Sequence, residues 1–194
     1  MSKFDYNLIA IGAGSGGLVS TFIASAVKAK VALIEKHKMG GDCLNTGCVP
    51  SKALISSAKA VQMLKKHTLY GLKNVSYEVD FALTMERVQD IIAKVELHDS
   101  VARYSSLGVE CHIGEAMIRS PHEVEVKGEA LTTKNIVVAT GARPFVPPTP
   151  GLDDVQFSHS DNIWDLRKQP KHLAVIGDGP IGSETGTSLQ EAWI

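Results

Sequence analysis

The chain has 194 residues, 44% of them hydrophobic, which is enough to bury the core of one large domain or of one domain and part of another. Its 20 basic and 21 acidic residues leave a net charge of -1, so charge gives no basis for binding nucleic acid or an anionic membrane. The N-terminus lacks a signal peptide's apolar core, no stretch approaches the roughly 18 apolar residues of a membrane span, and three cysteines argue against a structural disulfide framework. We therefore expect a cytoplasmic protein that binds neither nucleic acid nor membranes.

The first 35 residues combine a strand, a glycine-rich turn, a helix and a second strand. Residues 6–11 form an apolar run of strand length, residues 18–30 are helix-like, and residues 30–34 have the pattern of a buried strand. Between them lies a GxGxxG pattern, in the context in which this pattern binds a dinucleotide. The alternative is a loop that only requires small residues.

Each residue of the GxGxxG pattern has a predicted role. Gly12 permits the tight turn, Gly14 lets the backbone approach a pyrophosphate, and Gly17 lets the helix pack closely on the strand. Glu35, 18 positions after Gly17, is placed to accept hydrogen bonds from ribose hydroxyls.

Two cysteines five positions apart, Cys43 and Cys48, lie within the segment GGDCLNTGCVPSK at residues 40–52. The residues between them include turn formers, which permit a small disulfide ring. Pro50 suits the first turn of a following helix, so Cys48 is expected at a helix N-terminus, where a thiolate is stabilised. The spacing alone leaves redox chemistry and a structural role equally open, whereas zinc is disfavoured because no CxxC spacing is present and no metal site is expected.

The segment GGDCLNTGCVPSK resembles the active-site signature of the pyridine nucleotide-disulfide oxidoreductases, the flavoenzyme family of dihydrolipoyl dehydrogenase, glutathione reductase and mercuric reductase. Its ending, Ser51-Lys52, is most similar to the dihydrolipoyl dehydrogenase and mercuric reductase branches. The resemblance implies that the first fold binds FAD, that NAD(P)H donates or accepts electrons, and that the flavin exchanges electrons with the Cys48 sulfur. It also implies that Cys43 is the more exposed thiol, which meets the substrate.

The resemblance implies further site residues. Lys52 matches a lysine near the flavin N5, and Glu184 matches the glutamate that pairs with it. Asp42 stands where the best-known branches have threonine, so the substrate stays open among a small-molecule disulfide, a dithiol and a metal ion. The remaining residues implied to bind the cofactor are Ser15, Gly16, Gly41, Asp42, Ala116, Thr140 and Gly141.

The middle of the chain contains two helical stretches followed by short strands. Residues 51–64 and 81–95 have apolar residues at helical spacing, and we expect both helices to cover the sheet. Strands are expected at residues 109–113, 116–119, 124–127 and 135–139. So many short strands suggest an antiparallel meander inserted in an otherwise parallel sheet, an arrangement that resembles the family's flavin domain, which ends in the motif matched by Ala139-Thr140-Gly141.

The proline-dense residues 143–152 predict an extended linker and a domain boundary. Beyond it, an apolar strand at residues 172–176 leads into a second GxGxxG, Gly177, Gly179 and Gly182, which resembles the start of the family's NAD(P)-binding domain.

The expected architecture is α/β: a Rossmann-like FAD-binding domain with the inserted meander at residues 1–145, then the linker and the start of a second nucleotide-binding fold at residues 146–194. Compared with the family that it resembles, the sequence lacks three parts. These are most of the second nucleotide-binding fold, the rest of the flavin domain, and a dimerisation domain with a catalytic histidine. We therefore expect the N-terminal part of a longer, homodimeric enzyme, inactive as an isolated chain, or alternatively a non-catalytic flavin-binding module.

Overall fold

The structure is a computed structural model that describes residues 3–193, with side chains through residue 191. The chain forms two compact units, Met1–Asn45 with Lys94–Arg143 and Thr46–Ala93 with Pro144–Ile194. Each unit therefore combines segments that are distant in the sequence. The predicted division at residue 145 stays a prediction.

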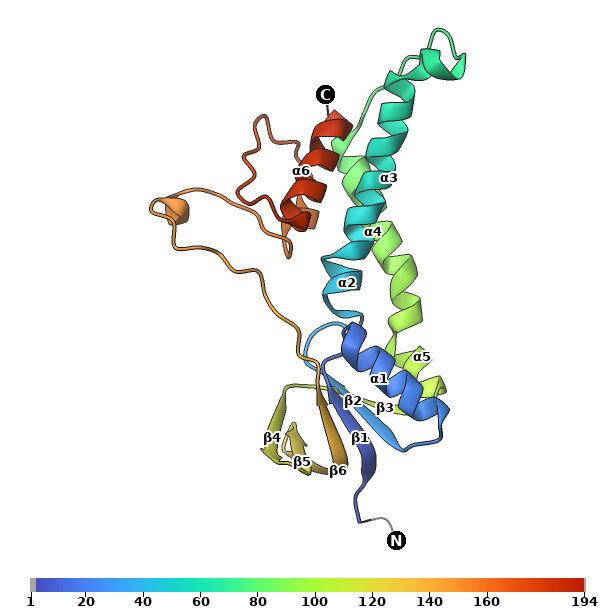
Figure 1. Ribbon diagram of the computed structural model, residues 1–194, viewed down its shortest axis with the longest axis vertical. Helices are drawn as coiled ribbons and strands as arrows, with labels where there is room; N and C mark the ends of the chain where they lie inside the picture. The colour runs from blue at the N-terminus through green and yellow to red at the C-terminus, as the bar shows by residue number, and fades with distance from the viewer. Residues whose placement is uncertain (1–2, 194) are drawn as a thin grey trace. The chain divides into compact units, whose positions relative to one another are not determined.

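The first unit contains a six-stranded mixed sheet in the order β3-β2-β1-β6-β5-β4 (Figure 1). The strands β3, β2, β1 and β6 are parallel, and β4, β5 and β6 are antiparallel, which confirms the predicted α/β class. The segment at 109–113, expected within the meander, instead pairs with β2 at the parallel edge. The strands are β1 (Tyr6–Ile11), β2 (Val31–Glu35), β3 (Val109–Ile113), β4 (Ala116–Ser120), β5 (Glu123–Val126) and β6 (Glu129–Val138).

One face of the parallel strands packs against the meander. Because successive strand residues point to opposite faces, Ile9 of β1 and Ile34 of β2 lie on the same side, where they join one buried cluster with Val124 and Val126 of β5. The antiparallel strands thus cover a face that a crossover helix would otherwise occupy.

The opposite face packs against two helices, α1 (Ser15–Ala26) and α5 (Val101–Ser106). Leu33 of β2 shares a buried cluster with Leu18 of α1 and Tyr104 of α5. Burial on both faces explains why β1 and β2 are nearly continuous apolar runs.

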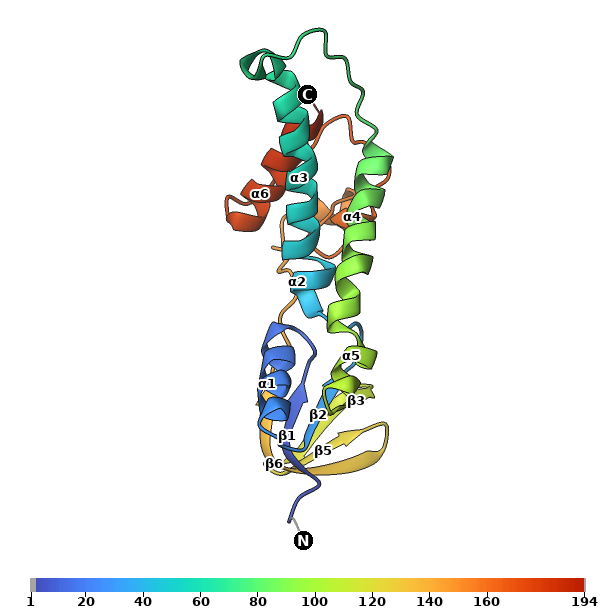
Figure 2. The same cartoon turned by 90° about the vertical axis from the view of Figure 1, so that its right-hand side faces the viewer.

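The second unit is helical in its described residues. It contains α3 (Cys48–Lys65), most of α4 (Phe81–Glu96) and α6 (Pro180–Trp193). Arg87 of α4 donates to the carbonyl of Ala53 at 2.9 Å and to the hydroxyl of Ser57 at 3.1 Å, which fixes α4 alongside α3 (Figure 2).

The predicted helices α3 and α4 are confirmed, whereas the expectation that they cover the sheet stays a prediction. The helices packed on the sheet are α1 and α5, whereas α3 and residues 81–93 of α4 belong to the second unit. Phe81, Met85, Val88 and Ile92 of α4 are buried as predicted. An apolar stripe predicts that a helix face is buried, but it does not identify the partner.

The segment from residue 144, where the chain enters the second unit for the last time, to the start of α6 has little regular structure. Residues 143–149 form neither helix nor strand, as the prolines predicted. Residues 172–176, predicted as a strand, form none, because a strand requires a hydrogen-bonded neighbour and the described part of the second unit contains no strand. The short 3₁₀ helices of the chain are η1 (His67–Tyr70), η2 (Leu97–Asp99), η3 (Leu152–Asp154) and η4 (Ile163–Asp165).

No helix within the described residues is long and apolar enough to cross a membrane.

Candidate functional site

The first glycine-rich turn joins the end of β1 to α1. Gly12 has φ of +101°, a value that side-chain-bearing residues rarely adopt. A Cβ added at Gly17 would lie 1.8 Å from the carbonyl oxygen of Gly12, so this glycine allows the helix to pack on the turn. No side chain caps α1 at Gly14, which leaves the N–H groups of its first turn for an anionic ligand.

A second glycine pair approaches this turn from the loop before α2 (Gly41–Asn45). A Cβ added at Gly41 would lie 2.5 Å from Cα of Gly14, and the N–H of Gly40 donates to the carbonyl of Ala13 at 2.9 Å. Asn45 holds the loop by donating to the carbonyls of Met39 and Gly41 at 3.0 and 2.9 Å. The two backbones thus form a cradle without side chains, which fits a pyrophosphate that must contact main-chain N–H groups.

The sequence indicated no role for Gly40 and indicated Asn45 only as a turn former. Gly40 has φ of +90°, and a Cβ there would collide with Leu44. The adjacent glycines at positions 40 and 41 were the available signal.

Glu35 at the end of β2 closes the turn. Its carboxylate accepts hydrogen bonds from the backbone N–H of Ala13 at 2.6 Å and of His37 at 2.8 Å. A carboxylate offers about four acceptor positions, so it can bind ribose hydroxyls as well. Its predicted role as a ribose acceptor stays a prediction.

The Ala139-Thr140-Gly141 motif follows β6 beside the same turn. The N–H of Ala139 donates to the carbonyl of Ile11 at 2.8 Å, and a Cβ added at Gly16 would lie 3.3 Å from the Cβ of Ala139. A Cβ added at Gly141 would lie 3.7 Å from a carboxylate oxygen of Asp42.

The first unit therefore brings most of the predicted FAD-binding residues together. The group comprises Gly12, Gly14, Ser15, Gly16, Gly17, Glu35, Gly41, Asp42, Thr140 and Gly141. Ala116, which is half-buried at the start of β4, packs against the cluster under the meander instead.

Cys43 lies in α2 of the first unit, and Cys48 is the first residue of α3 in the second unit, which confirms its predicted place at a helix N-terminus. Both are present as thiols. Cys43 is half-buried and Cys48 is exposed, so the expectation that Cys43 is the more exposed thiol is wrong.

Cys111 is the third cysteine and lies in β3. Burial raises the pKa of its thiol, which disfavours the reactive thiolate. Cys48, in contrast, is exposed at the start of α3.

In the second unit, Lys52 of α3 forms an ion pair with Glu184 of α6, so the structure joins these two predicted residues. The hydrogen bond from Lys52 is the main reason why the pKa of the Glu184 carboxyl lies below its ordinary value of 4.5. Both side chains are partly exposed, which limits the stabilisation to about 1 kcal/mol or less.

Replacing Glu184 with glutamine is expected to lower the free energy of unfolding slightly at pH 7 and by less at pH 3. The pair's contribution is complete above the ordinary pKa of 4.5 and disappears as the pH falls through the lowered folded-state pKa, because the protonated carboxyl no longer attracts Lys52. Urea unfolding at both pH values measures the difference. Glu191→Gln on the same helix is the control, and an effect at pH 3 as large as the effect at pH 7 would contradict the assignment.

The second glycine motif precedes α6. Gly177 has φ of +115°, and a Cβ at Gly182 would lie 2.5 Å from the carbonyl oxygen of Gly177, the same contact that Gly17 makes with Gly12. A Cβ at Gly179 would meet nothing within 4 Å. The motif therefore adopts the turn that suits a dinucleotide, although the preceding residues form no strand.

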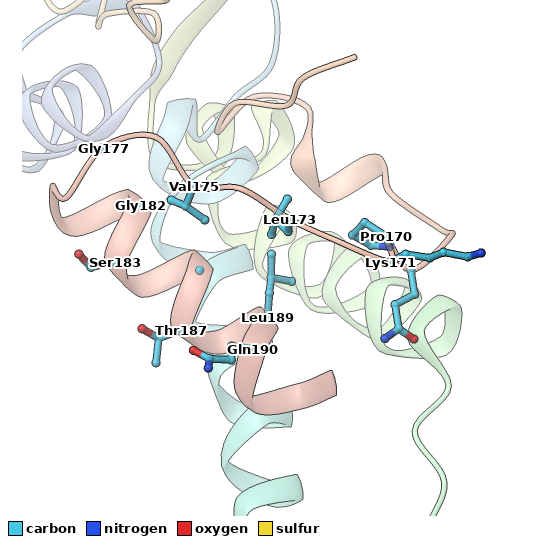
Figure 3. A pocket seen from close by; sticks show the side chains of 12 residues that line it. Pro170, Lys171, Leu173, Val175, Gly177, Gly182, Ser183, Thr187, Leu189 and Gln190 are labelled. Atoms are coloured by element: carbon cyan, nitrogen blue, oxygen red, sulfur yellow. The ribbon is translucent and has the colours of Figure 1, made fainter. Parts of the chain in front are cut away.

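An open pocket of about 580 Å³ lies between residues 169–177 and α6 (Figure 3). Leu173, Val175 and Leu189 supply apolar walls, and Ser183 and Thr187 supply hydroxyl groups. Within the described residues, no group of three or more histidine, cysteine or acidic side chains is placed to hold a metal ion.

A match to the family described as pyridine nucleotide-disulphide oxidoreductase covers residues 6–192. The chain belongs to the pyridine nucleotide-disulphide oxidoreductase family. This agrees with the resemblance of the cysteine segment and with the two glycine motifs.

Relatives at similar identity carry three different names. The chain is 37% identical to a mercuric reductase of Bacillus cereus, over 95% of this chain and 29% of the relative. It is also 37% identical to a dihydrolipoyl dehydrogenase of Acholeplasma laidlawii, over 96% of this chain and 56% of the relative. A glutathione reductase of Nostoc sp. is 35% identical over 93% of this chain and 39% of the relative. The chain thus spans about a third to a half of the length of these relatives.

Among solved structures, the chain resembles the HOCl-induced flavoprotein disulfide reductase RclA from Escherichia coli, solved as a Cu(II) complex. The TM-score is 0.80 at 24% identity, over 96% of this chain and 40% of that chain. At this identity the likeness demonstrates the shared fold of this family member and that flavoprotein.

Proposed function

We propose that this chain is the part of a flavin-dependent disulfide oxidoreductase that binds FAD and contains the redox-active pair Cys43 and Cys48. The observation that carries the proposal is the close approach of Gly41 to Gly14, where an added Cβ would lie 2.5 Å from the opposing Cα. Cys43 follows two residues after Gly41 in α2. A redox thiol is thereby attached to the loop that packs on the pyrophosphate-binding turn.

The two cysteines perform thiol–disulfide exchange. One thiolate attacks a sulfur of the substrate disulfide, forming a mixed disulfide and releasing the first substrate thiolate. The second thiolate then attacks the cysteine sulfur of the mixed disulfide, which forms the Cys43–Cys48 disulfide and releases the second thiolate. Two electrons pass to the substrate, the released thiolates take up protons from solvent, and the reverse sequence oxidises a dithiol. Cys48 begins α3 and is exposed, so its sulfur is accessible to a substrate.

When bound, FAD supplies the two-electron chemistry that links this dithiol to NAD(P)H. The residues that would hold its pyrophosphate are those of the first glycine turn and Gly41, because their backbones form a cradle without side chains. The turn at Gly177, Gly179 and Gly182 supports a nicotinamide dinucleotide site in the second unit. Lys52 is held by Glu184, as the proposed place beside a flavin requires.

Other parts of the proposal concern the longer enzyme. Its substrate is a small-molecule disulfide, a dithiol or a metal ion, since the relatives are named for glutathione, dihydrolipoyl and mercuric chemistry. The family resemblance supports a homodimer, and the sparse cysteine usage supports a cytoplasmic location. The alternative, a non-catalytic flavin-binding module, is supported by the short span of the relatives that this chain covers.

Oxidation of the purified chain by oxidised glutathione is expected to close a Cys43–Cys48 disulfide. The peptide that contains both residues should lose the mass of two hydrogen atoms, and dithiothreitol should restore it. Mass spectrometry of the digested protein, with and without reductant, measures this change.

Single serine variants provide the controls for this experiment. Cys43→Ser and Cys48→Ser should each abolish the mass change, and the variant whose remaining thiol forms the mixed disulfide faster identifies the cysteine that attacks the substrate. Cys111→Ser should leave the change intact, because burial disfavours the thiolate of Cys111. Two thiols that persist in the oxidised wild-type protein, or one zinc ion bound per chain, would rule out the redox pair.

A further inference from the structure

Trp164 contacts the segment between the two cysteines. Its side chain is 4% exposed, and its indole N–H donates a hydrogen bond to the backbone carbonyl of Thr46 at 2.9 Å. Thr46 lies between Cys43 and Cys48 in the sequence but 118 positions from Trp164. A buried indole N–H without an acceptor is costly, so this hydrogen bond stabilises the buried position of Trp164.

The backbone of Trp164 is itself fixed. Its carbonyl accepts hydrogen bonds from the amide of Gln89 in α4 at 3.1 Å and from the guanidinium of Arg167 at 2.9 Å. The residue sits in the 3₁₀ helix η4, whose first N–H, at Ile163, donates to the carbonyl of His159 at 3.0 Å. Two side chains therefore fix the backbone of Trp164, and its indole donates to Thr46 from that fixed position.

The chain beyond Thr46 is also fixed. The N–H of Ser51 donates to the carbonyl of Gly47 at 3.1 Å, and the hydroxyl of Ser51, which is 7% exposed as a residue, donates to the carbonyl of Cys48 at 3.2 Å. Thr46 and Gly47 are the two residues that connect α2 to the helix that begins at Cys48. A hydrogen bond to Thr46 restricts this connection.

We propose that Trp164 is a positioning residue of the redox segment, whose indole N–H fixes the Thr46 carbonyl and thereby favours closure of the Cys43–Cys48 disulfide. A loop that is already restricted loses less conformational entropy when its ends are joined than a free loop does. The residue acts through the backbone and has no direct role in the exchange reaction. The inference rests on the proposed redox function of the two cysteines.

The expected result is that Trp164→Phe weakens the disulfide by about two- to tenfold, the worth of one net hydrogen bond. Phenylalanine retains an aromatic ring in the buried site and removes only the N–H donor. The equilibrium between dithiol and disulfide is measured in buffers of oxidised and reduced dithiothreitol, with iodoacetamide trapping and mass spectrometry. Circular dichroism confirms that the variants are folded.

Two further variants and one label sharpen the test. Trp193→Phe removes the other tryptophan of the chain and should leave the equilibrium unchanged. Gln89→Leu removes one hydrogen bond to the backbone of Trp164 and keeps the indole, and it should also weaken the disulfide. This variant takes the place of Trp164→Phe if Trp164→Phe does not fold. In wild-type protein labelled with ¹⁵N-tryptophan, the Trp164 indole proton should exchange slowly with solvent and shift when the disulfide closes.

Each outcome separates the two hypotheses. A wild-type protein that forms the disulfide, with an equilibrium equal to that of Trp164→Phe, overturns the role of Trp164 and leaves the redox function standing. A rapidly exchanging indole proton overturns it as well. A wild-type protein that forms no disulfide overturns both proposals.

Discussion

Replacement of Gly17 with alanine is expected to lower the free energy of unfolding of the first unit by about 3 kcal/mol or more, a large share of the 5 to 15 kcal/mol that stabilises a typical domain. The added Cβ would lie 1.8 Å from the carbonyl oxygen and 3.0 Å from the carbonyl carbon of Gly12. Both atoms belong to the main chain, and Gly12 already occupies the left-handed region. The collision can be relieved only if α1 moves away from the sheet.

Gly16→Ala is the matched control on the adjacent position of the same helix. Its Cβ would lie 3.3 Å from the Cβ of Ala139, a contact that small shifts can relieve, and alanine favours a helix over glycine by about 1 kcal/mol. Denaturant unfolding followed by circular dichroism measures both variants. If Gly17→Ala were as stable as Gly16→Ala, the close packing of α1 on the turn would be refuted.

The packing around Gly17 is also where the sequence was most informative. The start of the first unit is predicted by local patterns, all within the first 35 residues. Two apolar runs predict strands, glycines at fixed spacing predict the turn, and the stretch between them predicts a helix. β1 and β2 accordingly begin and end within one residue of their predicted bounds.

The sequence was least informative where structure depends on distant partners. The stripe of α4 predicted its buried face, but nothing in the stripe distinguishes a sheet from another helix, and Arg87 of α4 bonds to α3. Residues 172–176 are apolar enough for a strand but have no hydrogen-bonded neighbour in the described part of the second unit. The six-residue helix α5 is too short for its periodicity to be recognised.

The candidate site divides in the same way. The glycines, the cysteines and the Lys52–Glu184 pair were indicated by motif and resemblance. No local pattern encodes the relative exposure of Cys43 and Cys48, because it depends on tertiary packing. The same holds for the contact between Trp164 and Thr46, which joins residues more than 100 positions apart.

Gly14→Val is expected to weaken FAD binding by about 10- to 100-fold or more, the worth of one or more charge-assisted hydrogen bonds to the pyrophosphate. A Cβ at Gly14 would lie 3.7 Å from Cα of Gly41, an ordinary contact, so the protein without ligand can accept a small side chain. The branched side chain would, however, block the close approach of an anion to the backbone N–H groups of this turn. Fluorescence titration with FAD measures the loss, and thermal melting verifies that the fold persists.

Gly179→Val is the control in the second motif. A Cβ there would meet nothing within 4 Å, so this variant should fold and bind FAD as the wild-type protein does, because Gly179 belongs to the turn proposed for the nicotinamide dinucleotide. The two variants thus place the same side chain at the same position of two equivalent turns. If Gly179→Val lost FAD while Gly14→Val retained it, the two cofactors would have been assigned to the wrong folds. If both variants retained it, the Gly14–Gly41 cradle would not be the pyrophosphate site.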